Sequence, residues 1–189
     1  MNPVPGFQHT CQTCGVTETM EHILLRCKAK GRKEAWTLTK TLWKRRKQPW
    51  TDVALEDIMT AGMGQYPTQE NAKRKESSAR LWRIIIPETA HLIWKLRCER
   101  VIGHADEDGW EHSRREIIRR WYATINRRLQ IDMIATNKRF GHLAKNRALV
   151  WSTWTGTIGD ELGLQEDWTR VPRVLVGIDP GICVEVDPG

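Results

Sequence analysis

Residues 81–96, LWRIIIPETAHLIWKL, form the middle of the longest helical pattern in this chain, which spans about 77–101. Its inward positions recur at helical spacing and cover a wide arc, which is typical of a central helix packed by several neighbours. These positions are Leu81, Trp82, Ile85, Ile86, Thr89, Leu92, Ile93 and Leu96. Pro87 removes the hydrogen bond to the carbonyl of Arg83, so we expect a kink or a restart of the helix there.

Three shorter helical patterns precede this stretch, over 18–27, 31–47 and 54–60. The first is expected to break near Gly31, and Pro49 is expected to stop the second. The inward side chains of the second are Ala35, Leu38, Leu42 and Trp43, and those of the third are Leu55, Ile58 and Met59. Glycines and a proline predict a loop over 62–68.

Two helical patterns follow it, over 110–134 and 141–155. Asp108 is the expected N-cap of the first, because Glu111 three residues later completes a capping box, and 103–108 is a turn. The inward face of that helix is expected to hold Ile118, Trp121, Tyr122, Ile125 and Leu129. The run 174–178 is suited to an extended segment but lacks evident partner strands.

The expected fold class is therefore all-α, with a single helical domain, an N-terminal Cys-Cys-His-Cys zinc knuckle and an irregular C-terminal tail. The expected division is a zinc-knuckle arm over 1–30, a helical domain over 31–155 and an acidic, largely irregular tail over 156–189. A chain of 189 residues, 40% apolar and 28% charged, can form one domain with a hydrophobic core.

Positive charge is concentrated in two segments. Residues 1–50 and 111–155 each carry a net charge of +7, whereas 51–110 carry −2 and 156–189 carry −5. Two basic segments on one chain favour a polyanionic partner more than the total charge of +7 alone would.

No stretch approaches the roughly 18 uncharged apolar residues of a membrane helix, so no membrane partner is expected. The first six residues, MNPVPG, lack the basic start and apolar core of a secretory signal. An intracellular location, nuclear or cytoplasmic, is the resulting expectation. Thiols stay reduced there, so grouped cysteines indicate metal binding before disulfides.

Four potential ligands stand at the spacing Cys11-x2-Cys14-x7-His22-x4-Cys27. Three thiolates and one imidazole match the four tetrahedral ligands of a structural zinc site, so one structural Zn2+ is predicted. Gly15 permits the positive φ that such cysteine turns often require. On a regular α-helix His22 and Cys27 would point roughly 140° apart, so Cys27 is expected where the helix unwinds.

Two alternatives remain open for these residues. His9 could replace His22 as the fourth ligand. A redox pair at Cys11 and Cys14 would need a strand before it and a helix directly after it, and this segment indicates neither. Of the other cysteines, Cys98 is interpreted as a packed thiol and Cys183 as an uncommitted residue.

The segments 11–15 and 18–27 resemble the reverse-transcriptase zinc-binding domain, in the version found in the C-terminal part of fungal non-LTR retrotransposon polyproteins. Weaker similarity continues at Gly31-Arg32, Trp36, Leu42-Trp43, 88–100, 167–168 and 174–178. The resemblance implies that Cys11, Cys14, His22 and Cys27 bind zinc, beside reverse-transcriptase and RNase H domains. It implies no catalytic residue, because the Tyr-x-Asp-Asp motif of the polymerase and the acidic set of RNase H are absent.

Each basic segment places cations on one side of a predicted helix, opposite the apolar side. In the 31–47 helix these are Lys33, Lys40, Lys44 and Lys47, and in the 110–134 helix they are Arg115, Arg119, Arg120 and Arg127. Lys28, Lys30 and Arg32 follow the last zinc ligand. Such a face can simply be solvated, but together these residues predict sequence-independent contact with the phosphates of RNA or DNA.

Ten tryptophans are present, and most are expected in the core or at helix junctions. Trp50, after the lysines and Pro49, is the candidate for stacking on a base. The acidic groups 106–108, 160–161 and 166–167 fall in predicted turns or helix starts, where carboxylates cap and solvate. No motif of a hydrolase or a nucleotide-binding loop is present, so the chain is not expected to be an enzyme.

Two functions fit these patterns. The first is a non-catalytic accessory module that binds zinc and holds RNA or DNA for a neighbouring reverse transcriptase/RNase H protein. The second is an architectural or protein-interaction domain with a structural zinc, in which the cations only provide solubility.

Overall fold

The computed structural model describes residues 10–61, 72–164 and 167–177. Helices form the fold over these residues and no strand occurs among them, which confirms the all-α prediction. The α-helices are α1 (Arg32–Arg45), α2 (Leu55–Met59), α3 (Ala72–Cys98), α4 (Arg114–Ala135) and α5 (Arg147–Trp154). Shorter π- and 3-10-helical turns are η1 (His22–Arg26), η2 (Glu99–Gly103), η3 (Lys138–Leu143) and η4 (Trp168–Arg170).

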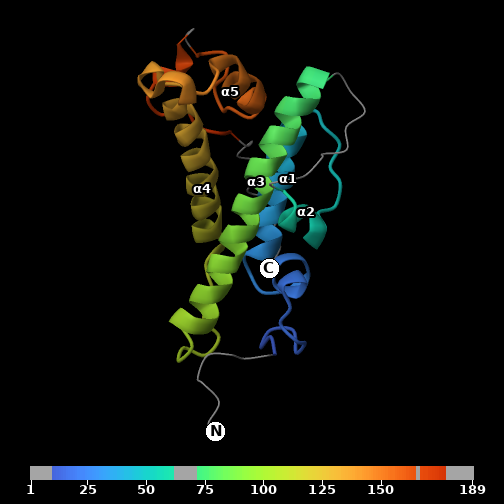
Figure 1. Cartoon of the computed structure of the whole chain (residues 1–189). Helices are drawn as coiled ribbons and strands as arrows, with labels where there is room; N and C mark the ends of the chain where they lie inside the picture. The colour runs from blue at the N-terminus through green and yellow to red at the C-terminus, as the bar shows by residue number, and fades with distance from the viewer. Residues whose placement is uncertain (1–9, 62–71, 165–166, 178–189) are drawn as a thin grey trace.

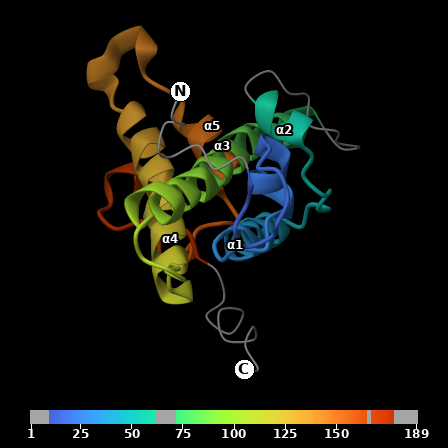
Figure 2. The same ribbon diagram turned by 90° about the horizontal axis from the view of Figure 1, so that it is seen from below.

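Helix α3 is the centre of the molecule, as predicted (Figure 1). It packs against α1, α2, α4, α5 and η1, and α1 also packs against α4, so that α1, α3 and α4 form a three-helix bundle. All predicted inward positions of α3 are buried, including the polar Thr89. The cysteine-containing segment lies beneath one end of this bundle, and α5 lies at the other (Figures 1 and 2).

Pro87 does not interrupt α3. The helix is continuous from Ala72 to Cys98 and passes directly into the π-helical turn η2, so the expected restart at Pro87 is wrong. Packing on several sides explains why one missing hydrogen bond does not break it, because Ile84, Ile85 and Ile86 before the proline are all buried.

A buried hydroxyl pair joins the three bundle helices. The Oγ1 atoms of Thr39 in α1 and Thr89 in α3 lie 2.7 Å apart, and Trp121 in α4 donates from Nε1 to Thr39 Oγ1 at 2.9 Å. All three side chains are buried. Each polar group therefore has a partner in the core, which fixes the relative positions of the helices.

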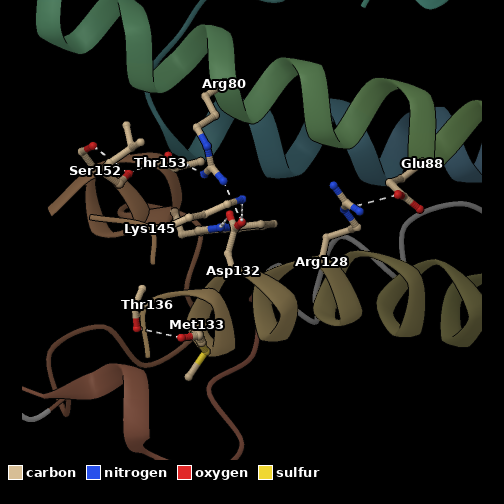
Figure 3. Close-up of polar contacts among 11 residues, drawn as sticks. Arg80, Glu88, Arg128, Asp132, Met133, Thr136, Lys145, Ser152 and Thr153 are labelled. Atoms are coloured by element: carbon tan, nitrogen blue, oxygen red, sulfur yellow. Dashed lines mark hydrogen bonds and ion pairs between the residues drawn. The ribbon is translucent and has the colours of Figure 1, made fainter. Parts of the chain in front are cut away.

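A second polar cluster, centred on Asp132 of α4, connects this helix to α3 and α5. Asp132 is 3% exposed. Its carboxylate accepts hydrogen bonds from Arg80 Nη2 at 2.6 Å, Lys145 Nζ at 2.8 Å and Trp154 Nε1 at 2.9 Å. Figure 3 shows Arg80 of α3 and Lys145 meeting on this carboxylate, with Arg80 also reaching Thr153 of α5.

Helix α4 begins later than the sequence pattern predicts. Its N-cap is Ser113, whose Oγ accepts from the backbone N–H of Glu116 at 3.1 Å, so the predicted cap at Asp108 is wrong. Gly109 adopts a φ of +72°, and Trp110 stacks on His104 at 3.6 Å between ring centroids. These contacts hold the segment before Ser113 outside the helix.

Other predictions need smaller corrections. Met59 is 69% exposed and does not face the core, and Ile117 is the fully buried residue of α4 where Ile118 was expected. The predicted 141–155 helix is shorter, because Gly141 has non-helical torsion angles and Asn146 caps α5 through its side chain. The predicted loop over 62–68 lies outside the described residues.

The segment after α5 packs onto the bundle. Ile158, Trp168, Val174 and Val176 are buried in the same core as the helices. An isolated antiparallel bridge pairs Ile158 with Val176, so the run predicted as extended has a short partner. The other described residues of this segment, over 156–164 and 167–177, are irregular apart from η4.

Candidate metal centre and basic surface

The first two cysteines lie in a tight turn closed by backbone hydrogen bonds. Thr10 and Thr17 form an antiparallel bridge, and the Cys11 carbonyl accepts from the N–H of Gly15 at 2.8 Å and from that of Cys14 at 3.2 Å. Gly15 has a φ of +69°, which confirms its predicted role. The turn therefore brings the two sulfurs to the same side of the chain.

His22 and Cys27 lie at the two ends of a π-helical turn, η1. In a π-turn the N–H of one residue bonds to the carbonyl five residues earlier, and here Cys27 N donates to His22 O at 2.6 Å. Cys27 itself has left the helix, with φ −56° and ψ 135°. The predicted unwinding at Cys27 is confirmed, and the wide turn places the two ligands beside each other.

The four side chains converge. Their ligand atoms all lie within 4.8 Å of one another, with Cys27 Sγ 3.8 Å from Cys11 Sγ and 4.0 Å from Cys14 Sγ. A tetrahedral zinc ion with bonds of about 2.3 Å holds its sulfurs about 3.8 Å apart. A disulfide would need sulfurs about 2.05 Å apart, and all three cysteines are free.

The burial of this group is what a closed metal site requires. Cys11, Cys27 and His22 are buried and Cys14 is half-buried. His22 Nε2 is buried and has no hydrogen-bond partner among the described residues. A buried ring nitrogen without a partner is costly, and a metal ion bound to its lone pair would satisfy it. The residues present therefore fit a metal ion.

The protein surrounds the sulfurs with contrasting environments. Burial raises the pKa of the Cys27 thiol to about 11. The backbone N–H of Lys28 donates to Cys14 Sγ at 3.2 Å and lowers the pKa of that thiol. An ion that binds here must displace the thiol protons, which metals that favour sulfur do.

Side chains from α1 and α3 fasten this segment to the bundle. Arg32 donates to the carbonyls of Cys27 and Leu25, and Trp36 Nε1 donates to the Leu24 carbonyl at 2.8 Å. From α3, Arg97 forms a largely buried ion pair with Glu18. The cysteine-containing segment is therefore joined to the first turns of α1, where Lys33 also lies.

The predicted nucleic-acid-binding cations differ in their surroundings. The exposed ones are Lys28, Lys33, Lys44, Lys47, Arg115, Arg119 and Arg127, and Lys40 is half-buried. None of these eight forms an ion pair within the described residues. In contrast, Lys30 pairs with Glu111 at 3.1 Å, and Arg32 is directed at backbone carbonyls.

Arg120 is part of an internal cluster that the sequence interpretation missed. Its guanidinium pairs with Glu99 of η2 and with Glu116 one turn earlier in α4. His112 lies beside both carboxylates, with its ring nitrogens 3.7 Å from Glu99 and 3.4 Å from Glu116. The i, i+4 spacing of His112 and Glu116 was the only sequence signal. Because the Arg120 guanidinium bonds to both carboxylates, we interpret the cluster as a contact that connects η2 to α4.

Trp50 lines a groove on the surface of α1. Its ring is half-buried and packs on Trp82, with centroids 5.4 Å apart. The groove, of about 300 Å³, is also lined by Arg32, Lys33, Trp36, Lys40 and Asp52. The structure thus places the predicted stacking residue beside two of the predicted phosphate-binding lysines.

Members of each of the three acidic groups 106–108, 160–161 and 166–167 have local partners. Glu107 pairs with His104, Glu161 accepts from the Gly156 N–H, and Asp167 pairs with Arg147 and Arg170. Glu166, His9 and Cys183 lie outside the described residues, and Cys98 is half-buried. No helix in the described ranges combines the length and apolarity that a membrane span needs.

No model of a known protein family, no curated protein and no solved structure matches this chain.

Proposed function

We propose that this chain is a non-catalytic, nucleic-acid-binding accessory module with one structural zinc ion on Cys11, Cys14, His22 and Cys27. The observation that carries the proposal is the convergent, buried group of three thiols and one imidazole, directly joined to a lysine-bearing helix. Three thiolates with one imidazole are a zinc-preferring set, and four protein ligands leave no open position for a substrate. Zinc here stabilises structure.

The nucleic-acid part of the proposal is supported by the lysines of α1 and the residues that follow it. Lys33, Lys40, Lys44 and Lys47 have no acidic partner among the described residues, and three of them are exposed. The resemblance of 11–27 to the reverse-transcriptase zinc-binding domain suggests the context. By that resemblance the module works beside the reverse transcriptase and RNase H domains of a retrotransposon-derived protein.

Metal analysis tests the first part. Purified protein should contain about one zinc ion per chain, and Cys14→Ser should lose the metal and unfold at lower temperature. Cys98→Ser is the matched control, since Cys98 is half-buried and outside the group, and it should retain full metal content. Wild-type protein without bound metal, or full zinc retention in Cys14→Ser, would refute the assignment.

Salt dependence of binding tests the second part. Affinity for RNA and DNA oligonucleotides should fall steeply between about 50 mM and about 200 mM salt, because each phosphate contact releases counterions. Absence of binding at the lower salt would refute a nucleic-acid role while leaving the metal centre intact.

The alternative function is an architectural or protein-interaction domain that contains the same zinc. It is favoured by the internal contacts of Arg32, Lys30 and Arg120, which show that part of the positive charge serves the fold. This alternative predicts that the quadruple variant Lys33→Ala/Lys40→Ala/Lys44→Ala/Lys47→Ala retains whatever nucleic-acid affinity the wild type has. The main proposal predicts a large loss.

A further inference from the structure

The groove beside the candidate metal centre combines aromatic surface with positive charge. Its lining includes Leu25 of the ligand-bearing turn η1 and Arg32, which donates to the Cys27 carbonyl. Trp36 and Trp50 line it with indole surface, and Lys33 and Lys40 line it with ammonium groups. An aromatic surface flanked by cations matches a ligand that has both flat rings and negative charge.

The two indoles are held in fixed orientations. Trp36 donates to the Leu24 carbonyl at 2.8 Å, and Trp50 lies at an interplanar angle of 54° on Trp82. Both remain half-buried, so each keeps part of its surface open to the groove. A ring that is already ordered loses little conformational entropy when a base stacks on it.

The cations form a line longer than a compact anion requires. Lys33 and Lys40 line the groove, and Lys44 continues the same side of α1 beyond its lining. Eleven residues of helix separate Lys33 from Lys44 by about 16 Å. Among the described residues none of the three has an acidic partner. A line of this length suits consecutive phosphates of a chain.

We propose that this groove binds an unpaired stretch of RNA or DNA, with its phosphates along Lys33, Lys40 and Lys44 and a base stacked on Trp50. The inference rests on the proposed function and restricts it to single strands, because the faces of paired bases in a duplex are already covered by their neighbours. Asp52 lines the groove beside Trp50 and repels phosphate, so bases occupy that side.

Anisotropy of labelled oligonucleotides of about 12 residues tests the groove, using the full zinc-loaded chain at about 50 mM salt. The wild type should bind oligo-dT or oligo-U about tenfold more tightly than a duplex of equal length. Lys33→Ala/Lys40→Ala should weaken single-strand binding about tenfold and reduce the salt slope by about 1.4. Trp50→Leu should weaken binding about tenfold without changing the slope, and Trp50→Tyr should restore most of the affinity.

Two variants away from the groove serve as matched controls. Lys138→Ala/Arg139→Ala removes the same charge from exposed residues of η3. Trp151→Leu removes a half-buried indole of α5 that lies on Trp168 at 5.3 Å and 58°, nearly the geometry of Trp50 on Trp82. Both controls should change single-strand affinity less than twofold.

The outcomes separate the groove from the broader function. Binding by the wild type that the lysine pair and Trp50 variants leave unchanged overturns the groove and leaves nucleic-acid binding standing. Equal affinity for duplex and single strand also overturns it. If the wild type binds neither the single strands nor the duplex, the proposed function fails together with the groove. Should Trp50→Leu unfold, the lysine pair decides the result.

Discussion

Gly31 joins the metal-binding segment to α1, and its backbone leaves no room for a side chain. It has a φ of +116°, and an added Cβ would lie 2.9 Å from Cδ1 of Leu96, which is itself 1% exposed. Its N–H also donates to Glu34 Oε2 at 2.8 Å, which fixes the start of the helix. The glycine is therefore needed for conformation and for space.

Gly31→Ala should accordingly lower the free energy of unfolding by about 1–3 kcal/mol, the usual cost of a strained backbone position. Gly103→Ala is the control, because no heavy atom lies within 4 Å of its added Cβ, and it should change stability by less than about 0.5 kcal/mol. Urea titrations followed by far-UV circular dichroism measure both. Equal effects of the two substitutions would contradict the steric explanation.

Asp132 should make the fold sensitive to acid. Its burial would by itself raise the pKa, but hydrogen bonds from Arg80, Lys145 and Trp154 outweigh burial and lower it. The carboxylate therefore stabilises the fold fully above its unfolded-state pKa of about 3.9, and this contribution is lost as pH falls through the lower folded-state pKa.

Asp132→Asn should lose about 3–5 kcal/mol of stability at neutral pH, because it breaks a buried charged network. The difference in unfolding free energy between wild type and variant should shrink below about pH 4, where the Asp132 carboxylate of the unfolded wild type starts to protonate. Measuring this difference at several pH values cancels the contributions of the other carboxylates. A difference that does not vary with pH would contradict the role assigned to the charge.

At the scale of elements, the N-terminus of α4 gives a direct test of which capping residue acts. Ser113→Ala removes the acceptor of the Glu116 N–H and should reduce stability by about 1 kcal/mol. Asp108→Ala should have an effect below about 0.5 kcal/mol, because Asp108 is exposed and lies before the helix. Thermal or urea unfolding of both variants distinguishes the caps, and the reverse ranking would restore the cap predicted from sequence.

That comparison shows what sequence can and cannot predict here. Both Asp108 and Ser113 have a glutamate three residues later, so local chemistry could not choose between them. The choice is made by tertiary contacts, in which Trp110 stacks on His104 and contacts His112 edge-on. The inward face of α3, in contrast, follows from periodicity alone, since burial of its apolar side chains dominates.

The metal ligands were predictable from spacing because four ligand types at short separations leave few alternative arrangements. The π-helical turn that aligns His22 with Cys27 was predictable only as a departure from regular helix. The α1 side of the groove follows from helical spacing, because Trp36 and Lys40 are one turn apart. The groove itself was not predictable, because only the folded chain brings Leu25 and Trp50 beside them.

At the scale of the whole molecule, the described part of the C-terminal segment, over 156–164 and 167–177, packs across the bundle. Gln130 and Asn126 of α4 bond to the backbone of Val174 and Val176, and Arg45 of α1 bonds to the carbonyls of Ile158 and Gly177. The segment therefore connects α1 and α4, the two helices that carry most of the exposed cations. One cationic side chain of α1, that of Arg45, is thus directed at backbone carbonyls of this segment.

Trp168 is the largest side chain that this segment adds to the core, with 6% exposure, and it packs on Trp151. Trp168→Ala should cost about 3–5 kcal/mol, because a cavity replaces a buried indole. Leu162→Ala, in the same segment, should cost little, since Leu162 is fully exposed at 102%. Chemical denaturation compares the two. A small effect of Trp168→Ala would mean that the bundle of α1, α3 and α4 is stable without this segment, whereas the expected loss makes residues 156–177 part of the domain.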